Sequence, residues 1–315
     1  MTAQIGLALS GGGARGLAHI GVLKVLEKAH IPVHLLAGTS MGGIIAALYA
    51  AGRSADEIER LARSLRLLDV AQRSRSGLGL LSQDKIARRV REALEGDLTF
   101  DQLKLPLALT AVDLETGEEI VIREGSVVEG VLATTAIPIA FPPVEWRGRL
   151  LIDGGVLNQV PFDVVRQMKA DVNEPVRVIA VHTVPSFCDE PENRIEPDGR
   201  GAEVLIRLLL SRTPWAPLVD IAERSQTIMI CKLVEQRMRD NPPDLMIRVP
   251  LSGVGLFDLD HVDFCVRAGQ EAARQHLAAL IELRDTPPPG LFTRWWRSLA
   301  RKRKSRQSQV PCTAK

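Results

Sequence analysis

The sequence predicts an α/β fold in which helices cover both faces of a central, mostly parallel β-sheet, a three-layer α/β/α arrangement. An apolar strand at residues 5–9 is followed by a glycine-rich loop, a helix and a second apolar strand. This order forms a βαβ unit, which sets two parallel strands side by side beneath a helix. The 315 residues are 45% hydrophobic, so the chain holds one large α/β domain or two small ones.

The first third of the chain alternates strands with helices. Apolar runs bounded by glycine or proline indicate the strands, and apolar residues at helical spacing indicate the helices. Ser54 and Glu57 have the spacing of a capping box at a helix start. The predicted strands cover residues 5–9 and 33–37, and the predicted helices cover residues 17–28, 43–51, 54–66 and 82–94.

The rest of the chain adds strands that are joined first by a turn and later by helices. A turn at residues 115–117 separates two strands, and three prolines make residues 138–143 extended. Residues 185–201 are polar and rich in proline and acids, which predicts a mobile loop. The predicted strands are 105–112, 119–123, 150–152, 176–181 and 245–249, and the predicted helices are 126–136, 202–210, 217–239 and 262–283.

Cysteine usage and charge distribution narrow the class of protein. The four cysteines are far apart and show no C-x-x-C pairing, which favours a reducing compartment over a disulfide framework or a zinc site. The sequence shows no signal-peptide pattern and no apolar run long enough to span a bilayer, so a cytoplasmic location is expected. Residues 1–290 carry a net charge of −6, whereas residues 291–315 carry eight basic residues and no acids. We therefore expect a domain at residues 1–286 and a basic tail at residues 287–315.

The strongest chemical signal is Ser40, which lies in a G-x-S-x-G motif between an apolar strand and an apolar helix. Strand, motif and helix together predict a nucleophile elbow, a sharp turn that exposes a serine hydroxyl at a helix N-terminus. Gly38 and Gly42 are expected to be needed because side chains beside the serine would clash at so tight a bend. The helix N-terminus also offers unpaired N–H groups where an oxyanion would form.

The glycines upstream, Gly11, Gly12, Gly13 and Gly16, also fit a dinucleotide-binding fingerprint. That interpretation requires an acidic residue at the end of the next strand, and no Asp or Glu occurs between residues 31 and 41. A P-loop is excluded because no G-K-[ST] follows. The remaining chemical use is an oxyanion hole built from the amides of Gly11–Gly13. Arg15 would then either hold this loop in shape or attract an anionic head group.

Two side chains are candidates for the base that activates Ser40. His182 follows the strand at residues 176–181, and the usual hydrolase order is serine, acid, histidine. Asp153 ends a short strand and is followed by Gly154 and Gly155, which lets a carboxylate project beside another backbone. An ordinary carboxylate is a weak base for a serine proton, so Asp153 needs burial and proximity to serve. The residues alone leave both candidates open.

Three ordered motifs, at residues 11–16, 38–42 and 153–155, resemble those of patatin-like phospholipases, most closely bacterial members related to the neuropathy target esterase catalytic domain. The segment 135–144, Asn158 and Pro161 are similar as well. The resemblance covers residues 4–165 and the elements at 245–283. It implies a Ser40–Asp153 dyad without histidine, an oxyanion hole from Gly11–Gly13, and hydrolysis of lipid acyl esters without a metal or other cofactor. One departure is His182, where related bacterial proteins tend to carry aspartate.

The basic tail contains an amphipathic segment, Leu291–Arg306. Leu291, Phe292, Trp295, Trp296 and Leu299 share one helical face, and arginines and lysines occupy much of the rest. This composition is typical of a helix that lies among anionic lipid head groups, so we expect peripheral binding to the inner face of a membrane. A solvated tail is the alternative, and nucleic-acid binding is not expected. For the whole chain, the alternative to a lipid hydrolase is a non-catalytic membrane-associated scaffold.

Overall fold

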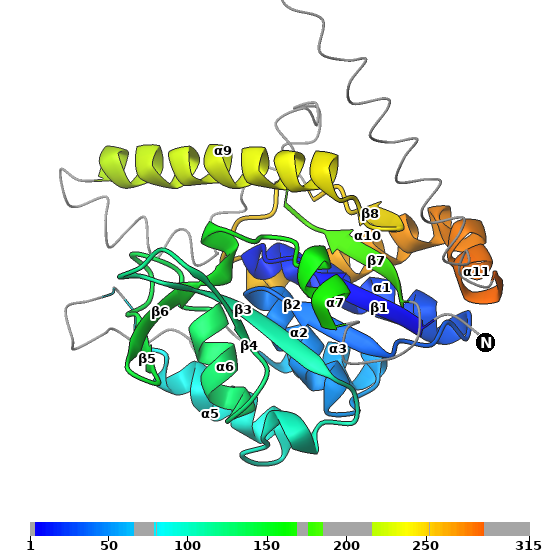
Figure 1. The fold of residues 1–315 in the computed structure, drawn as a ribbon, viewed down its shortest axis with the longest axis horizontal. Helices are drawn as coiled ribbons and strands as arrows, with labels where there is room; N and C mark the ends of the chain where they lie inside the picture. Colours follow the sequence, from blue (N-terminus) through cyan, green and yellow to red (C-terminus); the bar gives the residue numbers. More distant parts are fainter. Residues whose placement is uncertain are drawn as a thin grey trace, which may run out of the picture.

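The fold is a three-layer α/β/α arrangement around an eight-stranded sheet, seen in a computed structural model that describes residues 4–65, 79, 81–168, 176–184, 216–251 and 253–286 (Figure 1). The strands are β1 (Gln4–Leu9), β2 (Leu35–Gly38), β3 (Leu107–Asp113), β4 (Glu119–Ile122), β5 (Val144–Trp146), β6 (Arg149–Asp153), β7 (Val176–His182) and β8 (Leu245–Arg248). They follow the order β5-β6-β3-β2-β1-β7-β8, and β4 pairs with β3. Strands β3, β2, β1, β7 and β8 are parallel, as predicted.

Helices cover both faces of this sheet. The α-helices with described bounds are α1 (Ala18–Lys28), α2 (Met41–Ala50), α3 (Ala55–Ser64), α5 (Asp84–Leu94), α6 (Val127–Thr134), α7 (Phe162–Met168), α9 (Ala216–Asp240), α10 (Val262–Gln275) and α11 (Leu277–Asp285). Short 3-10 turns lie at Gly13–Leu17, Phe100–Gln102, Gly154–Val156 and Leu259–His261. The predicted capping box at Ser54 and Glu57 is present at the start of α3.

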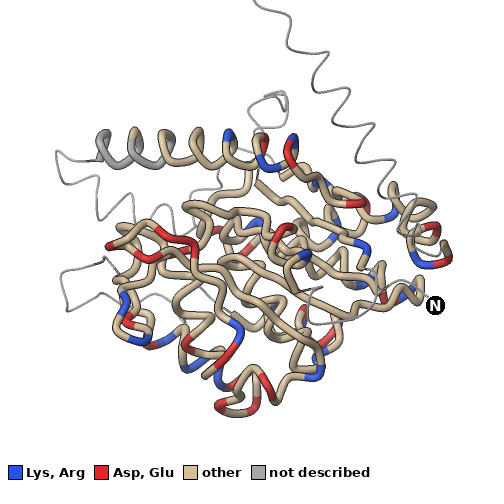
Figure 2. The backbone as a smooth tube through the Cα atoms, in the orientation of Figure 1, with Lys and Arg blue, Asp and Glu red and all other residues tan. Residues whose placement is uncertain are grey.

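Alternation along β1 shows how the core divides into two layers. Ile5, Leu7 and Leu9 are fully buried against the helices of one face, chiefly α1, α2, α3, α6 and α10. Ala8 faces the other side, where Phe162 and Val165 of α7 pack with the end of α9. The two central strands β1 and β2 carry no charged residue, and many of the charges in Figure 2 lie on the outer helices and loops. This double coverage explains why the central strands are continuously apolar.

The register of β3 brings together the ends of two other strands. Gly38, the last residue of β2, pairs with Leu109, and Asp153, the last residue of β6, pairs with Ala111. Leu109 and Ala111 both pair with β4 on their other side, so β2 and β6 share one edge of β3. The strands β2 and β6 therefore approach each other end to end, with only Thr110 between their partners on β3.

Three local features differ from the sequence-based predictions. Strand β5 and helix α7 were not predicted, because each is too short to show a clear period. The helix predicted at 262–283 is two helices, which separate at His276 where the backbone leaves helical geometry. Residues 138–143 were predicted to be extended, but a turn closes there with Phe141 N–H donating to Ile137 O at 2.9 Å.

Several sequence-based predictions concern residues outside the described ranges. These are the loop at 185–201, the helix at 202–210, and the basic tail with its segment Leu291–Arg306. Among the described helices, none is long and apolar enough to cross a lipid bilayer. Between Ser225 and the end of α9, the charged residues begin at Lys232 and continue to Asp240 (Figure 2).

Candidate active site

Ser40 occupies a strained turn between β2 and α2, as the elbow motif predicts. Its backbone has φ 52° and ψ −125°, and it is the N-cap residue of α2. A Cβ atom on Gly42 would lie 2.4 Å from the carbonyl oxygens of both Leu9 and Ser10, and one on Gly38 would lie 2.6 Å from the Gly43 Cα. These close approaches explain why glycine is needed on both sides of the serine. The Ser40 N–H donates to Thr134 Oγ1 at 2.9 Å, which holds the turn from α6.

Asp153 meets Ser40 at the junction of β2 and β6. Its backbone N–H donates to Ala136 O at 2.9 Å, and its Oδ1 accepts the Gly155 N–H at 2.7 Å. A Cβ atom on Gly154 would lie 2.3 Å from Thr110 Oγ1, so the turn after Asp153 also requires glycine. Burial raises the pKa of the Asp153 carboxyl group to about 6, and hydrogen bonds from the Ser40 hydroxyl and the Gly155 amide partly offset that rise. Burial therefore makes this carboxylate a stronger base than an exposed aspartate.

His182, the other candidate base, lies at the end of β7. Strand β1 separates β7 from β2, so His182 is two strands away from the strand that carries Ser40. The side chain is buried, and its backbone carbonyl accepts the Val249 N–H at 2.9 Å. The hydrogen bonds that shift the pKa of Asp153 come from Ser40 and Gly155, not from this imidazole. The geometry thus brings Asp153, and not His182, to the serine.

The amides of the glycine loop are not equivalent. Gly11 N–H donates to Gln159 O at 3.0 Å, so it already has a partner. Within the described residues, the N–H groups of Gly12 and Gly13 donate to no other group. Both glycines have positive φ angles, 145° and 58°, and Gly13 lines the cavity that Ser40 enters. The two amides of Gly12 and Gly13 are therefore the ones available to an oxyanion.

A segment after β8 supports this loop from outside. Ala14 N–H donates to Leu256 O at 2.7 Å, and Arg15 Nε donates to Val254 O at 2.6 Å. Inside the fold, His19 of α1 is fully buried and its Nε2 lies 2.8 Å from Ser10 O. Burial lowers the pKa of His19 to about 4, so this imidazole is neutral at pH 7. Of the two roles considered for Arg15, the hydrogen bond to Val254 O supports the one in which it holds the loop in shape.

A buried polar network holds Thr39, the residue before the serine, and its contacts join segments that no local sequence pattern connects. Thr39 Oγ1 donates to Asn158 O at 2.8 Å. The Asn158 amide donates to Glu119 at 2.7 Å and to Asp163 at 2.9 Å, and both carboxylates also pair with Arg237 of α9. The network joins β4, α7 and α9 to the elbow. The family resemblance singled out Asn158 in the sequence, but its partners Glu119 and Asp163 carry no distinguishing pattern.

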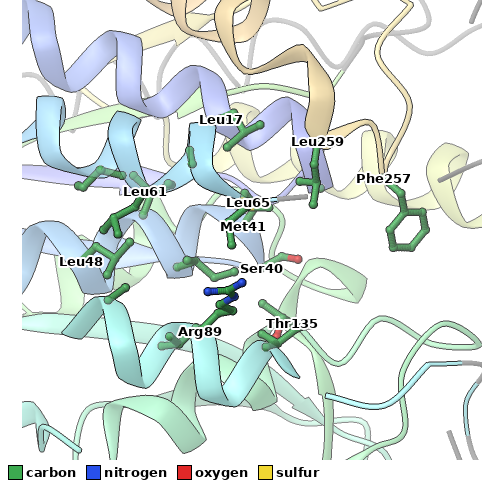
Figure 3. Close-up of a pocket in the computed structure, with 18 of the residues that line it drawn as sticks. Leu17, Ser40, Met41, Leu48, Leu61, Leu65, Arg89, Thr135, Phe257 and Leu259 are labelled. Carbon is green, nitrogen blue, oxygen red and sulfur yellow. The ribbon is translucent and has the colours of Figure 1, made fainter. Parts of the chain in front are cut away.

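Ser40 opens into an apolar cavity of about 250 Å³ (Figure 3). One wall is a face of α2, and the others come from α3, α5, residues 135–141 and residues 256–259. In Figure 3, Leu48 and Leu61 lie at the end away from Phe257. Leu48 lies eight positions after Ser40, so the cavity runs for about 12 Å along the α2 axis. The arrangement suits a flexible apolar chain whose reactive end lies at the serine hydroxyl.

Among the described residues, no group of three or more His, Cys, Asp and Glu side chains is placed to hold a metal ion. The site instead combines a hydroxyl group, a buried carboxylate, free amides and an apolar cavity. These are the parts that acyl transfer requires, since a tetrahedral oxyanion needs preplaced donors and a nucleophile needs a base.

Several known proteins are similar to this chain in sequence. An uncharacterized NTE family protein of Mycobacterium tuberculosis is 36% identical over 194 residues, 60% of this chain and 52% of that protein. A second NTE family protein of that organism is 31% identical over 284 residues, 89% of this chain and 47% of the relative. Patatin-like phospholipase domain-containing protein 6 of Mus musculus is 36% identical over 174 residues, 53% of this chain and 13% of the relative. The chain thus spans about half the length of these two bacterial relatives and 13% of the length of the mouse protein.

The chain is also similar to a solved structure, and part of it matches a family model. The structure of VipD from Legionella pneumophila aligns with a TM-score of 0.49 and 15% identity, covering 88% of this chain and 67% of that one. A family model described as patatin-like phospholipase matches residues 7–166, which include Ser40, Asp153 and the glycine loop. Because this match covers half of the sequence, the chain belongs to the patatin-like phospholipase family.

Proposed function

We propose that the protein is a serine acyl hydrolase that cleaves carboxyl esters of phospholipids or lysophospholipids. The observation that carries this proposal is the contact between Ser40 and the buried Asp153 at an apolar cavity. Family membership supports a lipid ester as the substrate class. The peripheral membrane role expected for the tail remains part of the proposal.

The chemistry follows from the positions of these groups. Ser40 Oγ attacks the ester carbonyl carbon while Asp153 takes its proton. The carbonyl oxygen becomes an oxyanion, which the amides of Gly12 and Gly13 and the N-terminus of α2 stabilise. Asp153 then returns the proton to the leaving alcohol, and an acyl-enzyme remains. Water then attacks the acyl-enzyme carbonyl carbon while Asp153 takes a proton from it. The bond between the acyl carbon and Ser40 Oγ breaks, Asp153 returns the proton to Oγ, and the fatty acid leaves.

A labelling experiment tests the proposal directly. A fluorophosphonate probe should label Ser40 in the folded protein, and Ser40→Ala should abolish both labelling and ester hydrolysis. Absence of labelling in well-folded protein would support the non-catalytic scaffold. If Asp153→Ala kept its activity while His182→Gln lost it, the Ser-His-Asp alternative would replace the dyad.

The raised pKa of Asp153 predicts the pH dependence of hydrolysis. Because the carboxylate acts as a base, kcat/KM for a neutral ester should fall below pH about 6, the pKa expected for Asp153. The fall should approach tenfold per pH unit. The measurement is a pH profile on a water-soluble ester, with His182→Gln as the control that should keep the same acid limb. A limb near pH 4, the range of an ordinary aspartate, would contradict the assignment.

The far end of the cavity should set the acyl-chain length. Leu48 is buried on the α2 face about 12 Å from Ser40, so Leu48→Phe places extra bulk where the end of a long chain would lie. We expect kcat/KM for long-chain esters to fall about tenfold, while short-chain esters change by less than about threefold. A series of p-nitrophenyl esters measures this. A uniform loss across the series would indicate a general packing defect.

The tail makes a separate and sequence-based prediction. Removing residues 291–315 takes away two tryptophans and eight basic residues. Cosedimentation with anionic liposomes should weaken, because apolar anchoring and charge attraction are both lost, while turnover of a soluble ester should not change. Unchanged cosedimentation would favour a solvated tail.

A further inference from the structure

We infer that Arg89 of α5 recognises the phosphate of the lipid substrate beside the catalytic serine. This inference rests on the proposed function, since it assumes that an ester is cleaved at Ser40. The cavity lining is apolar apart from a few side chains, and among its described residues the charged ones are Arg89 and Glu92. A charged pair in the wall of an otherwise apolar cavity offers the one charged contact that a bound ligand would meet among these described lining residues.

The position of Arg89 differs from that of its neighbour Arg88. The two residues are consecutive on α5. The Arg88 side chain is 61% exposed and lies outside the cavity lining, whereas the Arg89 side chain is 38% exposed and lines the cavity. Figure 3 shows the Arg89 guanidinium extending from α5 into the cavity, toward Ser40. Helix α5 thus presents one arginine to solvent and the next to the bound substrate.

The direction of α5 places this guanidinium near the reactive end of the cavity. Ile86, one turn before Arg89, packs against Phe141 and Leu81. Ala93, one turn after it, accepts a hydrogen bond from Arg53, which follows the end of α2. Helices α5 and α2 therefore run in the same direction. Arg89 follows Ile86 by one turn, and its guanidinium extends toward Ser40 (Figure 3), within reach of a group close to the scissile ester.

The chemistry of the guanidinium favours phosphate. Its planar fork of N–H donors matches two oxygens of a phosphate, and such charge-assisted bonds strengthen in an apolar environment. Arg89 Nη1 lies 3.2 Å from Glu92 Oε2, and Glu92 is 53% exposed. Exposed ion pairs of this kind contribute little, so the contact with Glu92 does not prevent the guanidinium from also binding a substrate phosphate. In lysophospholipids only the short glycerol backbone separates phosphate from ester, which suits the two positions.

Two esters that differ only by phosphate test the inference. Hydrolysis of monoacylglycerol and of lysophosphatidate with the same acyl chain is measured in mixed micelles of constant detergent. Arg89→Gln should lower kcat/KM for lysophosphatidate by about tenfold or more, and change it for monoacylglycerol by less than about twofold. Arg89→Lys, which keeps the charge but not the fork, should fall between. Glu92→Gln should raise kcat/KM for lysophosphatidate.

Arg88→Gln is the matched control and should leave both substrates unchanged. Equal losses on the two esters in Arg89→Gln and in Arg89→Lys, or no loss on either, would overturn the inference. A loss in Glu92→Gln like that in Arg89→Gln would do the same, because it would assign the pair a structural role. Monoacylglycerol hydrolysis by the unaltered protein, compared with Ser40→Ala, reports the proposed function separately. Addition of inorganic phosphate shows whether free phosphate competes for the same guanidinium.

Discussion

Asp153→Asn should reduce ester hydrolysis by about three orders of magnitude and, at neutral pH, make the protein more stable. The activity falls because the amide cannot accept the Ser40 proton. The stability rises because burial raises the pKa of Asp153 from 3.8 to about 6. The native state therefore binds a proton more tightly than the unfolded state, and this contribution to stability is lost as the pH rises from about 4 through 6. The shift corresponds to a cost on the order of 3 kcal/mol for the ionised carboxylate.

Urea unfolding at several pH values measures this effect. The difference in unfolding free energy between Asp153→Asn and the unaltered protein should be small near pH 4 and should grow toward pH 7. Asp113→Asn is the control, because Asp113 lies at the end of β3 and its pKa is lowered by hydrogen bonds from Glu115, Thr116 and Arg149 despite desolvation. That substitution should destabilise the protein at neutral pH and keep the Ser40 chemistry. A variant of Asp153 that is destabilised and still active would refute the dyad.

Gly42→Ala should prevent stable folding or lower the unfolding free energy by more than about 3 kcal/mol. The new methyl group would lie 2.4 Å from the carbonyl oxygens of Leu9 and Ser10. Both oxygens belong to the backbone at the end of β1, so relief requires moving either the central strand or the elbow. Such a movement would also displace the N-terminus of α2 from the carbonyl it must stabilise.

Gly117→Ala is the matched control for this prediction. Gly117 has φ 71°, and a Cβ atom there would meet nothing within 4 Å. Its substitution should cost only the conformational penalty of about 1–2 kcal/mol. Thermal and urea unfolding of both variants, with soluble yield as a further measure, decide the matter. A similar loss of unfolding free energy in the two variants would mean that the elbow can relax around a methyl group. The close approach at Gly42 would then not require glycine.

The sequence predicted those parts of the fold and site that depend on local chemistry. The elbow could be found because the tight turn at Ser40 requires glycine at positions 38 and 42, which lie within a few residues of the serine. The strands at β1 and β7 could be found because burial on both faces leaves them continuously apolar. Asp153 could be proposed because two glycines follow it, although its raised pKa depends on burial, which no local pattern shows.

The remaining features arise from contacts between distant segments. Gly11 was grouped with Gly12 and Gly13, but its amide is taken by Gln159 O, from a segment far along the chain. Thr134 supports Ser40 through a single hydroxyl, and a lone threonine at a helix end carries no specific pattern. Arg89 reads in sequence as one of several arginines on an amphipathic helix. Its place in the cavity depends on how α5 packs beside α2.

Because β2 and β6 meet on one edge of β3, the distance between the nucleophile and the base does not depend on the length of the polypeptide that connects them. Nucleophile and base come from segments more than a hundred residues apart, yet their spacing is set by Leu109, Thr110 and Ala111. Loops between α2 and β5 can therefore lengthen, shorten or acquire new lid segments without altering the distance between hydroxyl and carboxylate. Substrate preference can diversify in those loops, while a strand that supplies no reacting group keeps the catalytic pair in place.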